Sequence, residues 1–163
     1  MTADALPGLA ARVGAALKAR GQMLAVAESC TGGWVAQALT TIAGSSDWFE
    51  RGFVTYSNAA KEEMLGVSAA TLAAHGAVSE PTAREMARGA LARSHAQLAL
   101  AITGIAGPSG GTPDKPVGTV CFAWAAANGM LDAQTRRFDG DRDSVRRQSV
   151  AFALQRLLEL LGA

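Results

Sequence analysis

The sequence has few of the residues that build disulfide frameworks and transition-metal sites. Its 163 residues include two cysteines, Cys30 and Cys121, and two histidines, His75 and His95. Two cysteines are too few for a disulfide framework, and neither belongs to a CxxC pair. A His/Cys metal site needs more ligands than these residues supply. We therefore expect no disulfide and no metal.

Long apolar runs and an excess of one charge are also missing. No apolar run approaches the roughly 18 residues of a membrane span. The first twenty residues lack the basic start and apolar stretch of a signal peptide. Fifteen basic and fourteen acidic residues give a net charge of +1, which favours neither a nucleic-acid nor a membrane surface. We expect a cytoplasmic protein with no nucleic-acid or membrane partner.

Lysine is the scarce basic residue. Twelve of the fifteen basic residues are arginine, and the three lysines are Lys18, Lys61 and Lys115. Arginine stays protonated in proteins, whereas a buried lysine can lose its proton. Each lysine is therefore a candidate for a role that arginine could not perform.

The residues that are present predict one α/β domain over positions 1–163. Hydrophobic residues make up 49% and charged residues 18%, which is enough apolar material for a core. Apolar spacing predicts strands at 23–27, 49–57, 97–102, 117–127 and 131–138 and helices at 6–17, 34–42, 59–65, 69–75, 79–94 and 141–161. Asn128-Gly129 signals a hairpin. We expect a three-layer α/β/α sandwich around a mixed sheet.

Two glycine-rich segments directly follow predicted strands, where open α/β sheets bind ligands. In the first, Ser29, Thr31 and Gly32 lie between a strand and a helix start that could hold a phosphate. An ordinary capped turn explains the same residues equally well. The second begins at Thr103 and Gly104 and opens a long Gly/Pro loop, which is either functional or a surface connection.

A third segment carries candidate nucleophiles. Gly44, Ser45 and Ser46 precede a predicted strand, Tyr56 lies near the end of that strand, and Lys61 follows it. A serine needs a base to become a nucleophile, and a lysine can serve if burial lowers its pKa. Spacing alone also allows an unrelated serine and an exposed lysine.

Two further features leave alternatives open. Cys30 could be a thiol nucleophile or an inert residue at a strand end. The acidic run at 139–143 could be a metal loop, but Asp at helix-capping positions explains it better. Within that run Arg142 could grip a phosphate or carboxylate with its planar fork.

Six motifs in a fixed order resemble the CinA-type C-terminal domain family, and within it the stand-alone nicotinamide-nucleotide amidases. They are AESCTGGW (27–34), AGSSDWFERGFVTYSNAAKEEMLGV (43–67), HGAVSEPTAREMA (75–87), ITGIAGPSGG (102–111), KPVGTVCFAW (115–124) and FDGDRDSVRRQ (138–148). The resemblance extends from about residue 5 to residue 160. It implies cofactor-free, metal-independent hydrolysis of nicotinamide mononucleotide to nicotinic acid mononucleotide and ammonia, in pyridine-nucleotide salvage.

The resemblance also implies roles for individual residues. Ser46 is expected to be the nucleophile, Lys61 its base and Tyr56 an assisting residue. Substrate-binding residues are expected at Ser29, Thr31, Gly32, Gly44, Ser45, Thr103, Gly104 and Arg142. Oxyanion donors are expected around 44–46 or 103–107, and a homodimer or larger homo-oligomer is expected. The alternatives are an amidase for another pyridine or nucleotide amide and a nucleotide-binding regulatory module.

Overall fold

Five strands form one mixed sheet in the order β2-β1-β3-β4-β5. The computed structural model describes residues 5–163. Residues 1–4, which belong to the predicted domain and to the stretch compared with a signal peptide, lie outside the described residues. The strands are β1 (Leu24–Glu28), β2 (Phe49–Val54), β3 (Leu98–Gly104), β4 (Thr119–Ala126) and β5 (Leu131–Arg137). β1 pairs in parallel with β2 and β3, whereas β4 pairs antiparallel with β3 and β5.

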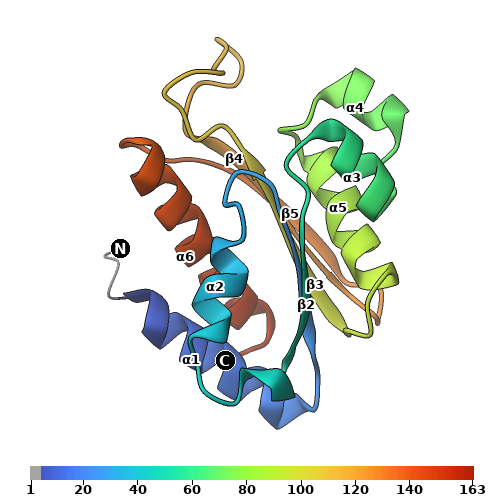
Figure 1. Ribbon diagram of the computed structural model, residues 1–163, viewed down its shortest axis with the longest axis vertical. Helices are drawn as coiled ribbons and strands as arrows, with labels where there is room; N and C mark the ends of the chain where they lie inside the picture. The colour runs from blue at the N-terminus through green and yellow to red at the C-terminus, as the bar shows by residue number, and fades with distance from the viewer. Residues whose placement is uncertain (1–4) are drawn as a thin grey trace.

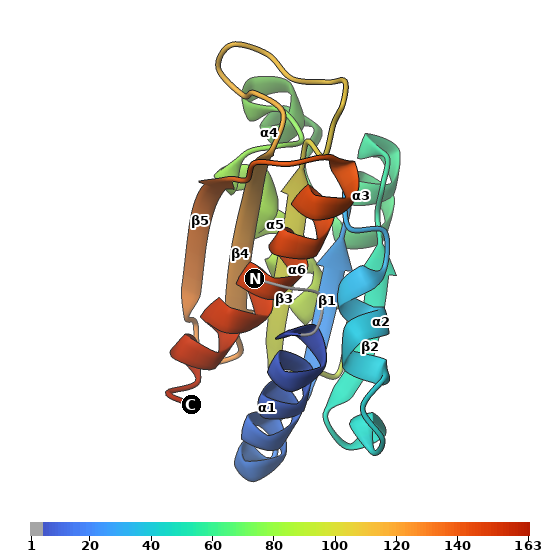
Figure 2. The ribbon, with the colours of Figure 1, turned by 90° about the vertical axis from the view of Figure 1, so that its left-hand side faces the viewer.

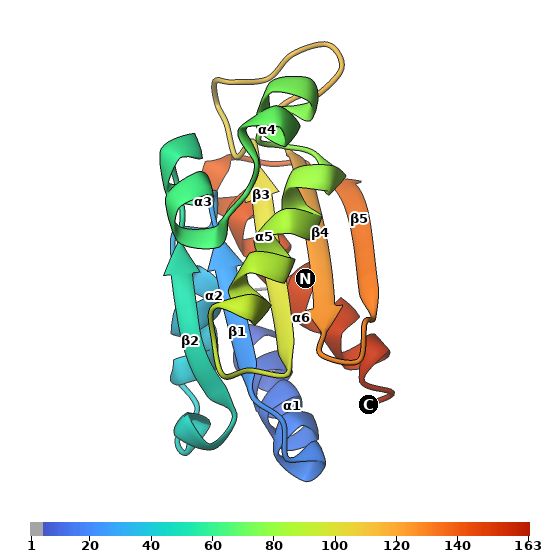
Figure 3. The same ribbon diagram turned by 90° about the vertical axis from the view of Figure 1, so that its right-hand side faces the viewer.

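Helices cover both faces of this sheet. They are α1 (Ala5–Arg20), α2 (Trp34–Thr40), α3 (Asn58–Leu65), α4 (Ala69–His75), α5 (Glu80–Ala92) and α6 (Arg142–Leu160), with a short 3₁₀ turn, η1 (Ser45–Asp47). α1, α2 and α6 lie on one face (Figure 2), and α3, α4 and α5 lie on the other (Figure 3). The predicted three-layer α/β/α sandwich around a mixed sheet is confirmed.

The two faces of the sheet differ in side-chain size. Alternate residues of a strand point to opposite faces. Large residues such as Leu100, Phe122 and Trp124 pack with α1, α2 and α6, whereas alanines such as Ala99 and Ala123 pack with α5. Because alanine side chains are short, α5 can pack close to this face of the sheet, and most of the residues that α5 buries there are also small. The buried positions of α5 are Thr82, Ala83, Met86, Ala87, Gly89 and Ala90.

The carboxyl ends of β1, β2 and β3 meet at one edge of the sheet, at the top of Figure 1. The 105–118 loop, α3, α4 and the first turn of α6 surround this edge. β2 ends at Val54, three residues earlier than predicted, because the chain turns there toward α3. This edge therefore collects segments that are far apart in the sequence.

Candidate active site

A cavity of about 230 Å³ opens at the carboxyl edge of the sheet. Its walls come from the strand ends, from the start of α3, from the segment before α5 and from the start of α6. The lining residues are Ser29, Cys30, Tyr56, Asn58, Lys61, Ala77, Val78, Thr103, Gly104, Ala106 and Arg142. Six of the residues expected from the sequence thus lie around one cavity: Ser29, Tyr56, Lys61, Thr103, Gly104 and Arg142.

Lys61 is a buried lysine in the first turns of α3. The side chain of Ser57 caps this helix by accepting a hydrogen bond from the Ala60 N–H. Only 1% of Lys61 is exposed, and burial lowers the pKa of its amine because the charged form loses hydration. Its Nζ lies 3.1 Å from Ser29 Oγ and 3.0 Å from the Tyr56 carbonyl oxygen. Lys61 therefore has the environment and the contact that a lysine base requires.

Ser29 is the first residue after β1. Its N–H donates to the Ile102 carbonyl of β3, which fixes the backbone at this position. Its hydroxyl lies 3.5 Å from the same Tyr56 carbonyl that Lys61 contacts. β1 lies beside β2, and Lys61 follows β2, so the sheet order brings Ser29 and Lys61 together across 32 positions of sequence.

Cys30 lines the cavity but is not suited to attack. Burial raises the pKa of its thiol to about 12, because the thiolate would lose its hydration. A thiol with this pKa stays protonated at neutral pH, and only the thiolate is a good nucleophile. The thiol alternative is therefore disfavoured.

Tyr56 and Arg142 form the mouth of the cavity. The Tyr56 hydroxyl accepts a hydrogen bond of 3.3 Å from Arg142 Nη2, and the Gly107 carbonyl accepts one of 2.7 Å from Arg142 Nη1. The Tyr56 side chain is 63% exposed. Its carbonyl oxygen, rather than its hydroxyl, holds Lys61 in this structure. Thr103 donates to the Ala77 carbonyl at 2.9 Å and so joins β3 to the wall before α5.

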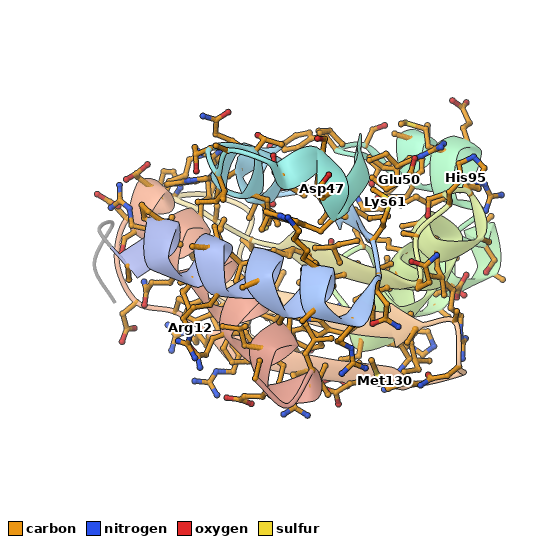
Figure 4. The ribbon with its side chains drawn as sticks, turned by 90° about the horizontal axis from the view of Figure 1, so that it is seen from below. Arg12, Asp47, Glu50, Lys61, His95 and Met130 are labelled. Carbon is orange, nitrogen blue, oxygen red and sulfur yellow. The ribbon has the colours of Figure 1, made fainter. Side chains whose placement is uncertain are left out.

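Ser46 does not meet Lys61 in this chain, contrary to the sequence-based expectation. It lies in η1, immediately before β2, whereas Lys61 lies beyond the other end of that strand. A six-residue strand spans about 20 Å. Figure 1 places η1 at the bottom of the molecule, and Figure 4, which views that end, labels the neighbouring Asp47 on this turn. Gly44 and Ser45 lie in the same place and do not line the cavity.

The helix start after Ser29 is not free to hold a phosphate, which corrects a second expectation. The Glu28 carboxylate occupies it and accepts hydrogen bonds from the N–H groups of Gly33, Val35 and Ala36. The Thr31 hydroxyl donates to the same carboxylate at 2.6 Å. Thr31 is fully buried, and neither Thr31 nor Gly32 lines the cavity. Their place is in the turn that supports the site.

Sequence reasoning did not identify Glu28 or Asn58 as residues of this region. Asn58 begins α3 and lines the cavity. Glu28 ends an apolar strand at a position where a buried carboxylate requires hydrogen-bond donors. That unusual placement was the one signal in the sequence that could have identified it.

The acidic run at 139–143 begins a helix. Asp141 caps α6 by accepting a 2.9 Å hydrogen bond from the Ser144 N–H, and Asp143 pairs with Arg147. Within residues 5–163, no three His, Cys, Asp or Glu side chains are grouped as a metal site would require.

No helix of the described part of the chain is long and apolar enough to cross a membrane.

The sequence is similar to those of known proteins over nearly its whole length. Nicotinamide-nucleotide amidohydrolase PncC of Escherichia coli (strain K12) is 62% identical over 157 residues, which are 96% of this chain and 95% of that protein. A CinA-like protein of Anaeromyxobacter dehalogenans is 56% identical, and the match covers 94% of this chain but 37% of the relative.

A solved structure confirms the fold. The competence/damage inducible protein of Agrobacterium tumefaciens superposes with a TM-score of 0.93 at 49% identity, covering 97% of this chain and 96% of that one. The family model of the CinA C-terminal domain matches residues 7–161. This chain belongs to the CinA C-terminal domain family.

Proposed function

We propose that this chain is a nicotinamide-nucleotide amidase, which hydrolyses the carboxamide of nicotinamide mononucleotide to nicotinic acid mononucleotide and ammonia. The name of the 62% identical relative supports the reaction. The observation that carries the chemistry is the buried Lys61 amine, 3.1 Å from the Ser29 hydroxyl at the wall of a cavity.

Ser29 is the proposed nucleophile and Lys61 its base. A neutral Lys61 amine can donate to the Tyr56 carbonyl and still accept the hydroxyl proton of Ser29. The serine oxygen then attacks the carboxamide carbon of the substrate and forms a tetrahedral intermediate. This pair takes the roles first expected of Ser46 and Lys61.

The N–H of Cys30 is the proposed oxyanion donor. The N–H after a serine nucleophile commonly serves this purpose. Within residues 5–163, the N–H groups of Cys30 and Thr31 donate to no other residue, whereas the N–H of Ser29 donates to the Ile102 carbonyl. Donors that are already oriented stabilise the charge that develops in the transition state. The expected donors at 44–46 precede β2 and lie outside the cavity lining, whereas donors from the 103–107 loop stay a prediction.

Ammonia departs when the intermediate collapses. The carbon–nitrogen bond breaks, the proton held by Lys61 passes to the leaving nitrogen, and Ser29 remains acylated. Water then attacks the ester carbon while Lys61 accepts its proton, and Ser29 leaves with that proton restored. One water is consumed and one ammonia is released in each cycle.

Arg142 is the proposed partner of the substrate phosphate. Its guanidinium lies at the cavity mouth and now donates to a loop carbonyl and to the Tyr56 hydroxyl. A phosphate offers stronger, charge-assisted hydrogen bonds to the same nitrogens. Tyr56, Thr103 and Gly104 complete the wall against which the nucleotide would lie.

Ammonia release tests this function directly. We expect turnover with nicotinamide mononucleotide and much less with free nicotinamide, which lacks the phosphate that Arg142 would bind. The dinucleotide tests whether a second nucleotide fits the cavity. Tight binding of the mononucleotide without ammonia release would contradict the amidase and favour a binding module.

The family resemblance also leads us to propose a homodimer or larger homo-oligomer and a cytoplasmic location. Sedimentation of the purified chain at several concentrations measures the first. Fractionation of cells that produce the protein measures the second.

A further inference from the structure

The turn that carries Ser29 is held by a buried carboxylate. Glu28 is 1% exposed, yet it lies next to the proposed nucleophile and is not one of the residues that line the cavity. Its Oε1 accepts from the Thr31 hydroxyl at 2.6 Å, from the Gly33 N–H at 3.2 Å and from the Val35 N–H at 2.9 Å. Its Oε2 accepts from the Ala36 N–H at 3.0 Å.

These bonds combine with others to use nearly every polar backbone group of the turn. Arg146 donates from Nε to the Cys30 carbonyl at 3.0 Å and from Nη2 to the Thr31 carbonyl at 3.2 Å. The Ser29 carbonyl accepts from the Gly32 N–H. Within residues 5–163, the N–H groups of Cys30 and Thr31 are the groups of this turn that donate to no other residue.

We propose that Glu28 is a positioning residue for catalysis: by occupying the start of α2, it fixes the turn so that the Ser29 hydroxyl faces Lys61 and the Cys30 N–H remains available to the oxyanion. Burial of a carboxylate is costly unless donors surround it, and here four donors do. A carboxylate with four acceptor positions is suited to gather three N–H groups and a hydroxyl at one point. The catalytic part of this proposal rests on the proposed function.

Glu28→Gln is the sharpest test. Glutamine has the same shape and keeps one oxygen, but it places an NH₂ group opposite one of the donors that the carboxylate satisfies, such as the Ala36 N–H. We expect the variant to fold, and we expect amide hydrogens of residues 33–36 to exchange faster than in the unmodified protein. We expect kcat for ammonia release to fall about 10²-fold, the loss typical of a misplaced oxyanion donor, with KM changed by less than about threefold.

Glu85→Gln is the matched control. Glu85 likewise accepts from a backbone N–H, that of Ser68, and from the Thr71 hydroxyl, but it does so at α4, outside the cavity lining. This variant should keep kcat. If Glu28→Gln does not fold, Thr31→Val decides the question, because it removes one donor to Glu28 without adding another; its kcat should fall with KM kept.

The outcomes separate the two proposals. A folded Glu28→Gln protein with normal kcat and normal exchange at 33–36 overturns the role of Glu28. So does a loss of activity that only follows the unfolded fraction. An unmodified protein that releases no ammonia contradicts the proposed function, while exchange at 33–36 still reports whether Glu28 holds the turn.

Discussion

At the scale of residues, one lysine out of three has a place that arginine could not take. Lys18 is exposed and pairs with Asp47 at the far end of the molecule. Lys115 reaches the His75 carbonyl from the 105–118 loop. Lys61 alone among them is buried against a serine hydroxyl. The scarcity of lysine therefore drew attention to the one lysine that lines the cavity, although it could not identify the serine that lies beside it.

Lys61→Arg should abolish useful turnover. Arginine stays protonated and cannot accept the Ser29 proton. Loss of general-base catalysis lowers kcat by about 10²–10⁴-fold. Steady-state ammonia release measures the effect, and Lys18→Arg, at an exposed site, should leave kcat unchanged. Equal activity of the two variants would contradict the role of Lys61.

The activity of the unmodified protein should rise with pH. Lys61 acts as a base only after it loses its proton, and burial lowers its pKa below the ordinary 10.5. The specificity constant kcat/KM should therefore increase as the pH rises past the lowered pKa of Lys61, and it should level off before pH 10.5. Stability should change in the same direction. Between the lowered pKa and 10.5 the unfolded chain binds more protons at Lys61, so the free energy of unfolding rises with pH.

Comparison with Lys61→Met isolates the contribution of Lys61 to the pH dependence of the free energy of unfolding. Methionine does not titrate, so the variant should lack the part of the pH dependence of unfolding that Lys61 contributes. Parallel denaturation curves from pH 7 to pH 10.5 measure the difference. If both proteins showed the same pH dependence, the lowered pKa of Lys61 would be contradicted.

Cys30→Ala should remain active. The thiol pKa of about 12 keeps Cys30 protonated, and the proposed mechanism uses only its backbone N–H, which alanine retains. We expect kcat within a few-fold of the unmodified value, since the loss of one buried sulfur disturbs packing modestly. Complete loss of ammonia release would return the thiol to consideration as nucleophile.

At the scale of elements, the position of α3 decides the position of Lys61. α3 packs on α5, and Gly89 of α5 lies directly beneath the Leu65 carbonyl at the end of α3. A side chain at Gly89 would collide with that carbonyl oxygen. The glycine is therefore required by the close approach of the two helices, although glycine weakens a helix interior.

Gly89→Ala should lower both stability and activity. The collision with α3 should reduce the free energy of unfolding by about 1–3 kcal/mol and displace Lys61. Thermal unfolding and kcat measure the two effects. Gly8→Ala in α1 is the control, because nothing lies near its Cβ position; it should leave activity intact and stabilise by about 0.5–1 kcal/mol. A Gly89→Ala protein as stable as the Gly8→Ala protein would contradict this packing.

Most elements were predictable from apolar periodicity. The strands β1, β3 and β4 are buried apolar runs, and the Asn128-Gly129 turn predicted the β4–β5 hairpin. Element ends were less predictable, because backbone contacts between segments set them. The N–H of Thr55, for example, donates to the Glu28 carbonyl just beyond the end of β2.

At the scale of the whole molecule, strand order assembles the site. Residues after β1, β2 and β3 become neighbours only because these strands lie side by side and in parallel. The sequence shows which residues follow strands but not which strands are adjacent. For that reason the sequence placed Ser29 and Thr103 after strands, where they line the cavity, but did not show that Ser29 lies beside Lys61.

The same arrangement separates Ser46 from the site. The pairing of Ser46 with Lys61 was expected from the family resemblance, but β2 lies between the two residues and carries the chain from one end of the sheet to the other (Figure 3). Residues before and after one strand are necessarily far apart. None of the residues 44–46 lines the cavity.

A comparison of Ser29→Ala with Ser46→Ala tests most directly which serine is the nucleophile. Each variant removes one hydroxyl and should leave the fold intact, as circular dichroism and thermal unfolding can establish. Ammonia release from nicotinamide mononucleotide is then measured for both. We expect Ser29→Ala to lose turnover by several orders of magnitude and Ser46→Ala to keep it. Retained turnover in a folded Ser29→Ala protein, with turnover lost in Ser46→Ala, would contradict the role of Ser29 as nucleophile.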